Sequence, residues 1–489
     1  MIRRALRTIA LAAAVANPWG TAVESQLIPV RTVPVASGDQ FLLLPSQTLG
    51  MGGVRYAVDD SIGDPWTNPA KGAALGTSAF FGAPTFYGIS GNQGGGRSFP
   101  VSGIFSGSAW FGGASLALQQ IENTNRDGTF FFAEPALAWL PPPTTTLSER
   151  FGRNLYASGF VGRRVTAQWS VGLGVTGSSL EAMDGVDLLY AGSERIEQSG
   201  SIKDFRVGAV HQGDADRLGL LLAHNRVSMR HDVTYFDNTV ASQRRVEENE
   251  DKTRTWAAQA SWDRDLTAPG WRMGASATAN YKTHPKIPNY TIQNIPRDPG
   301  TTWAYEVGFG FAMTEESSTF AVDVALQPIW SNTWQEANAA DVAASGGRLS
   351  LGDRSIENDF FFTNVVLRSG LSHQVGIVGL QTGVEVRSYD YQLEQANRVE
   401  STYREQDESW MEWSPTFGAV FGFPALDLRY GLRLTKGTGR PGTLNLNGPG
   451  LESLAAGGDA DFILAPGGAL TLQDATVVTQ QLSVSIPIR

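Results

Sequence analysis

The chain contains few side chains that could carry catalytic or metal chemistry. Among 489 residues there is no cysteine and there are only five histidines, so disulfides, thiolate metal sites and cysteine nucleophiles are excluded. The histidines form no i,i+4 pair and no H-E-x-x-H motif, and no G-x-S-x-G motif presents a serine. We therefore predict that the protein is not an enzyme and has no catalytic residue, metal site or cofactor, although a triad assembled only by the fold stays open.

A glycine cluster and three carboxylates lie close together near the N-terminus. The glycines at 50–53 are not followed by the Gly-Lys-Ser/Thr of a phosphate-binding loop. Asp59, Asp60 and Asp64 lack the alternating spacing of calcium ligands. We expect these carboxylates to be solvated or to cap backbone N–H groups.

The charge and the N-terminus indicate an exported protein that does not bind nucleic acid. A net charge of -10 and a pI near 5.1 argue against a surface that neutralises phosphates. Residues 1–16 combine three arginines, an apolar stretch and the small-x-small end Ala14-Val15-Ala16, which is the pattern of a signal peptide, so the mature chain is expected to begin near Asn17. No later segment has the ~18 consecutive apolar residues of a membrane helix. A membrane crossing would therefore use strands.

Polar and apolar residues alternate with period two through most of the chain. In 271–282, Trp271 and Tyr281 belong to an apolar face, whereas Arg272 and Lys282 belong to a face without large apolar residues. Such alternation predicts a sheet with one apolar face. The pattern recurs in 165–175, 256–262, 303–312, 320–330, 378–386, 411–421, 426–434 and 482–488.

Aromatic residues at both ends of the apolar faces favour a membrane barrel over a soluble sandwich or propeller, which would also alternate. From Trp271 to Tyr281 there are ten steps, and a rise of ~3.3 Å per residue at a tilt of ~40° gives a height of about 25 Å. That is the height of the apolar band of an outer-membrane barrel.

Short and long connections alternate, as in outer-membrane barrels, whose short turns face the periplasm. We predict short turns at 105–109, 162–165, 213–216, 265–269, 314–317, 372–374 and 422–425. We predict long polar loops at 123–153, 179–199, 234–252, 283–300, 335–357, 392–408 and 436–475. With a first strand near 76–90 and a last one near 476–488, these connections give about 16 strands and place both ends of the barrel in the periplasm.

The segment before the first predicted strand carries a recognisable motif. Residues 50–75 contain the glycine cluster, the run Tyr56-Ala57-Val58-Asp59-Asp60 and the signature Asn68-Pro69-Ala70. This segment resembles the N-terminal segment of the FadL/TodX-like family, the outer-membrane transporters of long-chain fatty acids and aromatic hydrocarbons, and also that of the related PorV-type barrels of type IX secretion. In these families it precedes a 14-stranded barrel, and in the transporters it folds inward as a hatch.

The pattern and the resemblance together predict an all-β fold, a transmembrane antiparallel β-barrel of 14 to 16 strands at 76–489, preceded by an N-terminal plug segment at 17–75. The resemblance implies that the lumen plug contains Gly50, Gly52, Gly53, Asn68, Pro69 and Ala70. Glycine allows positive φ and close backbone packing, and Asn-Pro forms turns. On the residues alone, a surface cluster of turns with no gating role is the alternative.

One predicted loop is strongly apolar. Residues 129–143 contain Phe130, Phe131, Phe132 and Trp139, followed by three prolines. An apolar loop must be buried or used for binding. Our hypothesis is that these four residues capture a hydrophobic ligand at the barrel mouth, and the alternative is that they fill the lumen.

We therefore predict a protein of the outer membrane of a Gram-negative-type bacterium that takes up hydrophobic small molecules, such as long-chain fatty acids or aromatic hydrocarbons, through a plugged lumen. Its expected partners are outer-membrane lipid, the hydrophobic substrate and the barrel-assembly machinery, although the chain ends at Arg489 without the usual terminal aromatic. A PorV-type secretion-associated or structural barrel that binds a protein partner is the alternative. The predicted plug argues against a general porin.

Overall fold

The computed structural model of the chain describes residues 27–122, 151–186, 195–237, 243–284, 299–337, 340–441, 462–465 and 468–488. The predicted signal peptide at 1–16 lies outside the described residues, as do Phe130, Phe131, Phe132 and Trp139 of the apolar loop. In the described part of the chain, no helix is long and apolar enough to cross a membrane.

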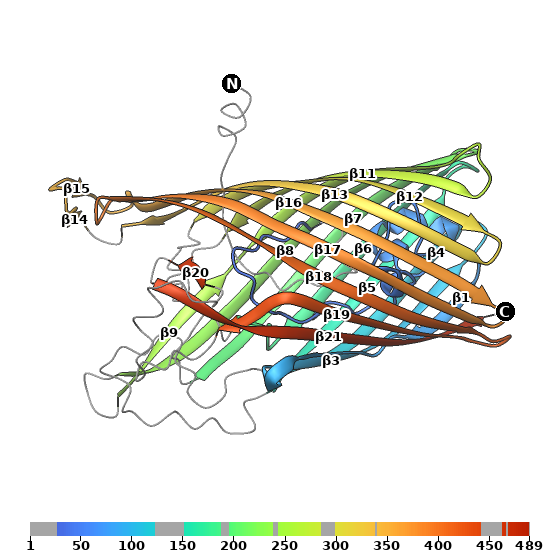
Figure 1. Ribbon diagram of the computed structural model, residues 1–489, viewed down its shortest axis with the longest axis horizontal. Coiled ribbons are helices and arrows are strands. Elements are labelled where there is room, and N and C mark those ends of the chain that lie inside the picture. The colour runs from blue at the N-terminus through green and yellow to red at the C-terminus, as the bar shows by residue number, and fades with distance from the viewer. Residues whose placement is uncertain are drawn as a thin grey trace.

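The chain forms a closed antiparallel barrel of 16 strands (Figure 1). The first barrel strand is interrupted at Pro84 and consists of β1 (Ser78–Gly82) and β2 (Thr85–Ile89). Both pieces pair with β3 (Gly95–Ser106) on one side and with β21 (Gly468–Ile488) on the other, which closes the barrel. The predicted fold class and strand number are thus confirmed.

A second barrel strand is also interrupted. Both β9 (Gln243–Asp251) and β10 (Arg254–Asp265) pair with β8 (Asp216–Asp237). The remaining barrel strands are β4 (Trp110–Glu122), β5 (Phe151–Arg164), β6 (Trp169–Leu180), β7 (Arg195–Gln212), β11 (Trp271–His284), β12 (Gly300–Glu315), β13 (Ser318–Glu336), β16 (Arg354–Val375), β17 (Val378–Asn397), β18 (Thr402–Gly422) and β19 (Asp427–Pro441).

Outside the barrel ladder, the regular elements are short. The strands β14 (Asp341–Val342) and β15 (Arg348–Leu349) pair with each other, and β20 (Phe462–Ala465) pairs with the start of β21. The helical turns are η2 (Leu49–Met51), α2 (Asp64–Thr67), η3 (Pro69–Ala74) and η4 (Ser90–Asn92). Three of these four turns lie in the segment that precedes the barrel.

The two faces of the strands are those that the alternation predicts. On β12, Trp303, Val307 and Phe309 are exposed on the outside, whereas Glu306 and Ala312 are buried toward the lumen. Rings of neighbouring strands contact one another on the outside, as between Tyr281 of β11 and Trp303, whose centroids are 4.7 Å apart. The outer surface of the barrel is therefore an apolar band with aromatic residues, suited to lipid.

Six of the seven predicted short turns lie at or overlap a short connection between neighbouring strands at one end of the barrel, whereas the turn predicted at 372–374 lies within β16 and the actual connection to β17 is at 376–377. Two predicted long loops are wrong. Residues 234–252 belong mostly to β8 and β9, and residues 392–408 belong mostly to β17 and β18, which are joined by a short turn. These strand ends carry outward polar residues such as Glu394 and Glu405. A strand that extends beyond the lipid needs no apolar outer face. The sequence of such a strand is therefore as polar as that of a loop, and this polarity led to the wrong prediction.

The neighbouring strands β18 and β19 separate from each other in the outer part of the barrel. These strands pair from Gly422 and Asp427 only as far as Trp413 and Lys436. Beyond that point, Gly437 has φ 82° and β19 continues to pair with β21. The side of Gly439 that would face β18 instead receives the N-terminal segment: Ala36 N–H donates to the Gly439 carbonyl (2.7 Å), and Gly439 N–H donates to the Pro34 carbonyl (2.8 Å).

Candidate functional site

Residues 27–75, which we call the inner segment, run through the barrel lumen (Figure 1). Near the outer end, Ile28 N–H donates to Asn280 of β11 (2.7 Å) and Gly38 N–H donates to Asp184 (2.6 Å). Near the periplasmic end, the segment leads into β1, whose Ser78 pairs with Ile488. The inner segment therefore descends the lumen from the outer half to the periplasmic rim before the barrel begins.

The backbone of the inner segment lies directly against glycines of the barrel wall. A Cβ atom on Gly274 would lie 1.7 Å from the Tyr56 carbonyl oxygen, and a Cβ on Gly370 would lie 2.2 Å from the Met51 carbonyl oxygen. Other wall glycines that a Cβ would bring within 3 Å of the inner segment are Gly172, Gly174, Gly208, Gly308, Gly310, Gly383 and Gly431. The inner face of the wall is thus shaped to admit a second layer of backbone.

Of the residues predicted for the plug, the three glycines lie against β16, β17 and β18. A Cβ on Gly50 would lie 2.7 Å from Gly418 Cα, so the two backbones touch. Gly52 and Gly53 have φ angles of 72° and 71°, a conformation that favours glycine. In addition, Gly52 N–H donates to Thr416 Oγ1 (2.8 Å). These glycines place a tight turn near the periplasmic end of the lumen.

The other three predicted plug residues lie across the lumen, against β6, β7 and β8. Asn68 caps η3 by accepting a hydrogen bond from Ala70 N–H (3.1 Å) and reaches the wall through its side-chain N–H, which donates to the Leu220 carbonyl (3.2 Å). Ser170 Oγ donates to the Ala70 carbonyl (3.0 Å), and Pro69 packs over Gly172. Residues 49–75 therefore form a floor that extends from one side of the barrel to the other.

A buried polar cluster joins the middle of this floor to β12 and β13. The Glu306 carboxylate pairs with Arg55 (2.6 Å) and accepts hydrogen bonds from the Tyr56 hydroxyl (2.9 Å) and from Gln327 (2.6 Å). The Asp323 carboxylate accepts the backbone N–H of Arg55 at 2.6 Å. Since Glu306 is only 3% exposed, its charge depends on these partners.

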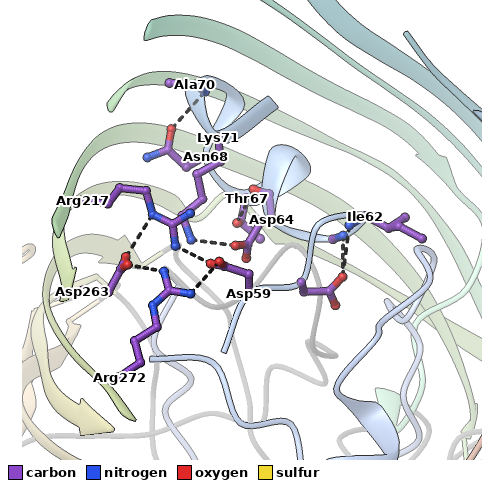
Figure 2. Close-up of polar contacts among 12 residues, drawn as sticks. Asp59, Ile62, Asp64, Thr67, Asn68, Ala70, Lys71, Arg217, Asp263 and Arg272 are labelled. Carbon is purple, nitrogen blue, oxygen red and sulfur yellow. Dashed lines mark hydrogen bonds and ion pairs between the residues drawn. The ribbon is translucent and has the colours of Figure 1, made fainter. Parts of the chain in front are cut away.

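A second charged cluster lies at the periplasmic rim (Figure 2). There the Asp59 carboxylate pairs with Arg217 of β8 and with Arg272 of β11, 2.8 Å away, and both guanidinium groups also contact Asp263 of β10. Burial alone would raise the pKa of Asp59, but the two guanidinium groups overcome that effect and lower it to about 2. This cluster links the inner segment to three wall strands.

The neighbouring carboxylates have separate roles within the floor. Asp60 caps the local turns by accepting the N–H groups of Gln47 and Gly63, each at 2.8 Å. Burial, together with the charge of Asp64, raises the pKa of Asp60 above its ordinary value. Asp64 itself pairs with Lys71 (2.8 Å; Figure 2). Two of the three carboxylates are thus ion-paired, and Asp60 is the capping group.

Two cavities lined by described residues of the lumen differ in chemistry. The larger, of about 260 Å³, is lined by apolar, neutral polar and charged residues, and its charged groups include the ion pairs of Arg31 with Glu412 (2.5 Å) and of Arg368 with Glu385 (2.5 Å). Asp39 of the inner segment pairs with Arg433 in the same cavity. Such a chamber suits water better than an apolar ligand.

The smaller cavity is apolar. It has a volume of about 30 Å³ and lies between the inner segment and strands β4 to β8. It belongs to a buried cluster that contains Phe41, Leu43, Tyr156, Ile202 and, deeper, Met229. Apolar side chains on the inside of a large barrel are unusual, because the lumen of an open channel is polar. Of these two cavities, this one has the more apolar lining, although its free volume is only that of about one water molecule.

No group of three or more potential metal-ligating side chains occurs among the residues that the structure describes. The sequence did not identify the wall glycines or the apolar pocket. A signal for the glycines was present, because glycine repeatedly occupies inward positions of strands, where it often marks a close backbone approach. The pocket had no comparable signal, since its residues come from six separate segments of the chain.

Comparisons with known proteins give likeness of fold only. No family model and no curated protein matches the chain. Similar solved structures include the toluene transporter TbuX of Ralstonia pickettii, with 11% identity over 90% of this chain and 97% of that one (TM-score 0.37). The toluene transporter TodX of Pseudomonas putida has 11% identity over 90% and 98% of the two chains (TM-score 0.39). A mutant of the ferric enterobactin receptor PfeA of Pseudomonas aeruginosa has 8% identity over 84% and 80% (TM-score 0.39).

Toluene transporters of the kind that the N-terminal motif resembles are thus among the structures with a similar fold. The location of the protein follows from its own surface. A closed barrel of 16 antiparallel strands, with short turns at one end and an apolar aromatic band outside, has the construction of bacterial outer-membrane proteins. The chain is a β-barrel protein of the outer membrane of a Gram-negative-type bacterium.

Proposed function

We propose that the barrel takes up hydrophobic small molecules, such as long-chain fatty acids or aromatic hydrocarbons, through the lumen that the inner segment occupies. The observation that carries the proposal is the apolar pocket inside the barrel, lined by Phe41, Tyr156 and Ile202. A general porin would need a continuous polar passage. Here the floor formed by residues 49–75 touches opposite walls, so passage requires the inner segment to move.

The proposal gives the chain three functional parts. Residues 1–16 direct export, residues 17–75 act as the plug, and residues 76–489 form the transmembrane barrel. Within the plug, Gly50, Gly52 and Gly53 contact one side of the wall, and the Asn68-Pro69-Ala70 turn contacts the other. The capture of ligand by Phe130, Phe131, Phe132 and Trp139 stays a prediction.

Uptake by whole cells tests the proposal. We would express the full chain in a bacterial host without a hydrophobic-compound transporter in its outer membrane and measure initial uptake of radiolabelled oleate and ethylbenzene. The variant Ile202→Asn introduces a polar group into the pocket and should abolish uptake of the transported compound. Its matched control is Ile329→Asn, because Ile329 is an equally buried, lumen-facing isoleucine in a separate apolar cluster.

The outcomes separate the candidate functions. Uptake that is lost in Ile202→Asn and kept in Ile329→Asn supports transport through the pocket. Equal loss in both variants would point to general damage of the lumen. Absence of uptake of both compounds by the wild-type chain, together with a protein that co-purifies with it, would overturn transport in favour of a PorV-type secretion-associated or structural barrel.

A further inference from the structure

We infer that the outside of the barrel carries a binding site for the phosphorylated headgroup of an outer-leaflet lipid, formed by Lys203 of β7, Arg226 of β8 and Arg254 of β10. The site lies on the face of the wall opposite to the lumen, so it goes beyond the proposed uptake function and does not depend on it. Three observations carry the inference: the register of these cations, their lack of counterions, and their position at the edge of the apolar band.

Strand pairing places the three cations in one row. Arg226 lies directly opposite Lys203 on one side and directly opposite Arg254 on the other. All three side chains are exposed on the outside, whereas their neighbours along the strands, such as Asp204 and Asn225, are buried toward the lumen. Residues opposite each other in paired strands have Cβ atoms about 5 Å apart, so the row of three is about 10 Å long.

The row has no counterion of its own. In the part of the chain that the structure describes, none of its three side chains forms an ion pair or a hydrogen bond. The acidic groups farther out on this side of the wall already have partners, since Asp232 pairs with Arg230 (3.0 Å) and Glu250 pairs with Lys252. Like charges directly opposite each other in a sheet are destabilising. An anion from outside the chain would relieve this repulsion.

The row lies at the outer edge of the apolar band. The next outward positions on the three strands, toward the membrane, are Phe205, His224 and Trp256, which also lie opposite one another. The rings of His224 and Trp256 stack with centroids 4.1 Å apart. Aromatic belts mark the level of lipid headgroups. Because the short connections at 213–215 and 266–270 lie at the other ends of these strands, the row faces headgroups of the outer leaflet.

The row ends at neutral residues on both sides. Lys203 lies opposite Gly177 of β6, and Arg254 lies opposite Thr283 of β11. The next residue in register beyond Thr283 is Thr301 of β12, which is also uncharged. The positive charge of the row is therefore confined to three adjacent strands, as expected for a binding site of defined size.

Phosphate is the anion that fits these side chains and this level of the membrane. A guanidinium group binds phosphate oxygens through two parallel hydrogen bonds, and an ammonium group binds phosphate as a point charge. The phosphates at this level belong to lipid headgroups, and the rings of Phe205 and Trp256 directly below would contact the acyl chains. Since the ends of the row are about 10 Å apart, the site suits a headgroup that carries two phosphate groups.

Lipid binding to the purified protein tests the site. We would add diphosphoryl lipid A to the full-length protein in detergent and measure bound lipid by native mass spectrometry. Monophosphoryl lipid A, which lacks one phosphate, should bind at least about tenfold more weakly, and millimolar inorganic phosphate should not displace the diphosphoryl lipid. Equal binding of the two lipids would overturn the assignment of two phosphates. Displacement by inorganic phosphate would assign the row to free anions and overturn the lipid site.

Loss of charge from the row should remove the site. The row variant carries Lys203→Gln, Arg226→Gln and Arg254→Gln. Its matched control removes three exposed cations from strands that do not neighbour one another, and carries Arg163→Gln, Arg264→Gln and Lys436→Gln. The row variant should bind diphosphoryl lipid A at least about tenfold more weakly than the wild type, and the control should bind it as the wild type does. Equal losses in both variants would overturn the site.

Unfolding with and without lipid tests the repulsion within the row. Arg226→Glu places a carboxylate between Lys203 and Arg254, so in lipid-free detergent it should unfold at a higher denaturant concentration than the wild type. After addition of diphosphoryl lipid A, the wild type should become the more stable of the two, because a ligand stabilises only the form that binds it. Lower stability of Arg226→Glu without lipid, or equal stabilisation of both proteins by lipid, would overturn the inference.

Discussion

The carbonyl oxygen of Tyr56 occupies the place that a Cβ atom would take on Gly274 of β11, only 1.7 Å from that position. Gly274→Ala should therefore push the inner segment off the wall. We expect a loss of about 1 to 3 kcal/mol in the free energy of unfolding, the usual cost of overpacking. Unfolding in denaturant measures this loss in the free energy of unfolding. Gly177→Ala on β6 is the control, because a Cβ there would meet nothing within 4 Å, and an equal loss in that variant would contradict the close packing at Gly274.

The Asp59 ion pairs predict a defined pH dependence. The pKa of Asp59 is lowered to about 2 in the folded protein, and a free aspartate has a pKa of about 3.9. Its contribution to stability is therefore present at neutral pH and is lost as the pH falls from about 4 toward 2. Because Asp59 is 39% exposed, we expect only about 1 kcal/mol.

Asp59→Asn should therefore unfold more easily than the wild type at pH 7, and the difference should shrink toward pH 2 and vanish below it. Paired denaturation curves across this range would show the convergence. A difference that stayed constant down to pH 2 would mean that the Asp59 charge does not stabilise the rim. Asp265→Asn serves for comparison, because Asp265 is 74% exposed and lies 3.8 Å from Arg272.

The Glu306 carboxylate has three polar partners at 2.9 Å or less, so its removal should leave the Arg55 guanidinium without its ion-pair partner. We expect Glu306→Gln to cost about 2 kcal/mol, somewhat less than breaking a fully buried pair, because Arg55 keeps some contact with solvent. A double-mutant cycle with Arg55→Gln should give a coupling energy above about 0.5 kcal/mol. Simple additivity of the two single variants would rule out a stabilising interaction between these side chains.

Phe309 tests the lipid-facing surface. It lies on the outside of β12, in the middle of the strand, with Ala275 and Val324 as its neighbours. Phe309→Arg should cost about 2 to 4 kcal/mol in lipid, as expected for an arginine at the bilayer midplane. Gln392→Arg, on the outer part of β17 beyond the apolar band, should change stability little. Equal effects measured in phospholipid vesicles would contradict the assigned position of the band.

Much of the wall could be predicted because lipid imposes a strict pattern. Six of the seven short turns and the inward and outward faces of β11 and β12 followed from period-two alternation, since one face must be apolar along the whole membrane crossing. The interruption of the first strand at Pro84 was missed, although proline lacks the N–H group that a ladder needs. The outer parts of β17 and β18 were missed because strands in water have no such pattern to follow.

The contents of the lumen were harder to predict. The N-terminal motif indicated which residues enter the barrel, but not what they contact. Gly52 meets β16 and β17, and Asn68 meets β8, so the partners lie more than 150 residues away in the sequence. Such contacts depend on strand register and barrel diameter, which local patterns do not specify. The ion pair of Asp204 and Arg206 illustrates this limit. In the sequence, two opposite charges near each other on one strand give the same pattern whether they face a lumen or solvent.

The hydrogen bonds between Gly439 and the Pro34 and Ala36 backbone have a consequence for the cooperativity of the fold. At this point of the wall, the N-terminal segment takes the place of a neighbouring strand for β19. The outer part of β19 is therefore fully paired only when the N-terminal residues are inside the barrel. The barrel and its contents should then form and unfold in a single cooperative transition, and a chain deprived of its N-terminal segment would leave β19 with an unsatisfied edge.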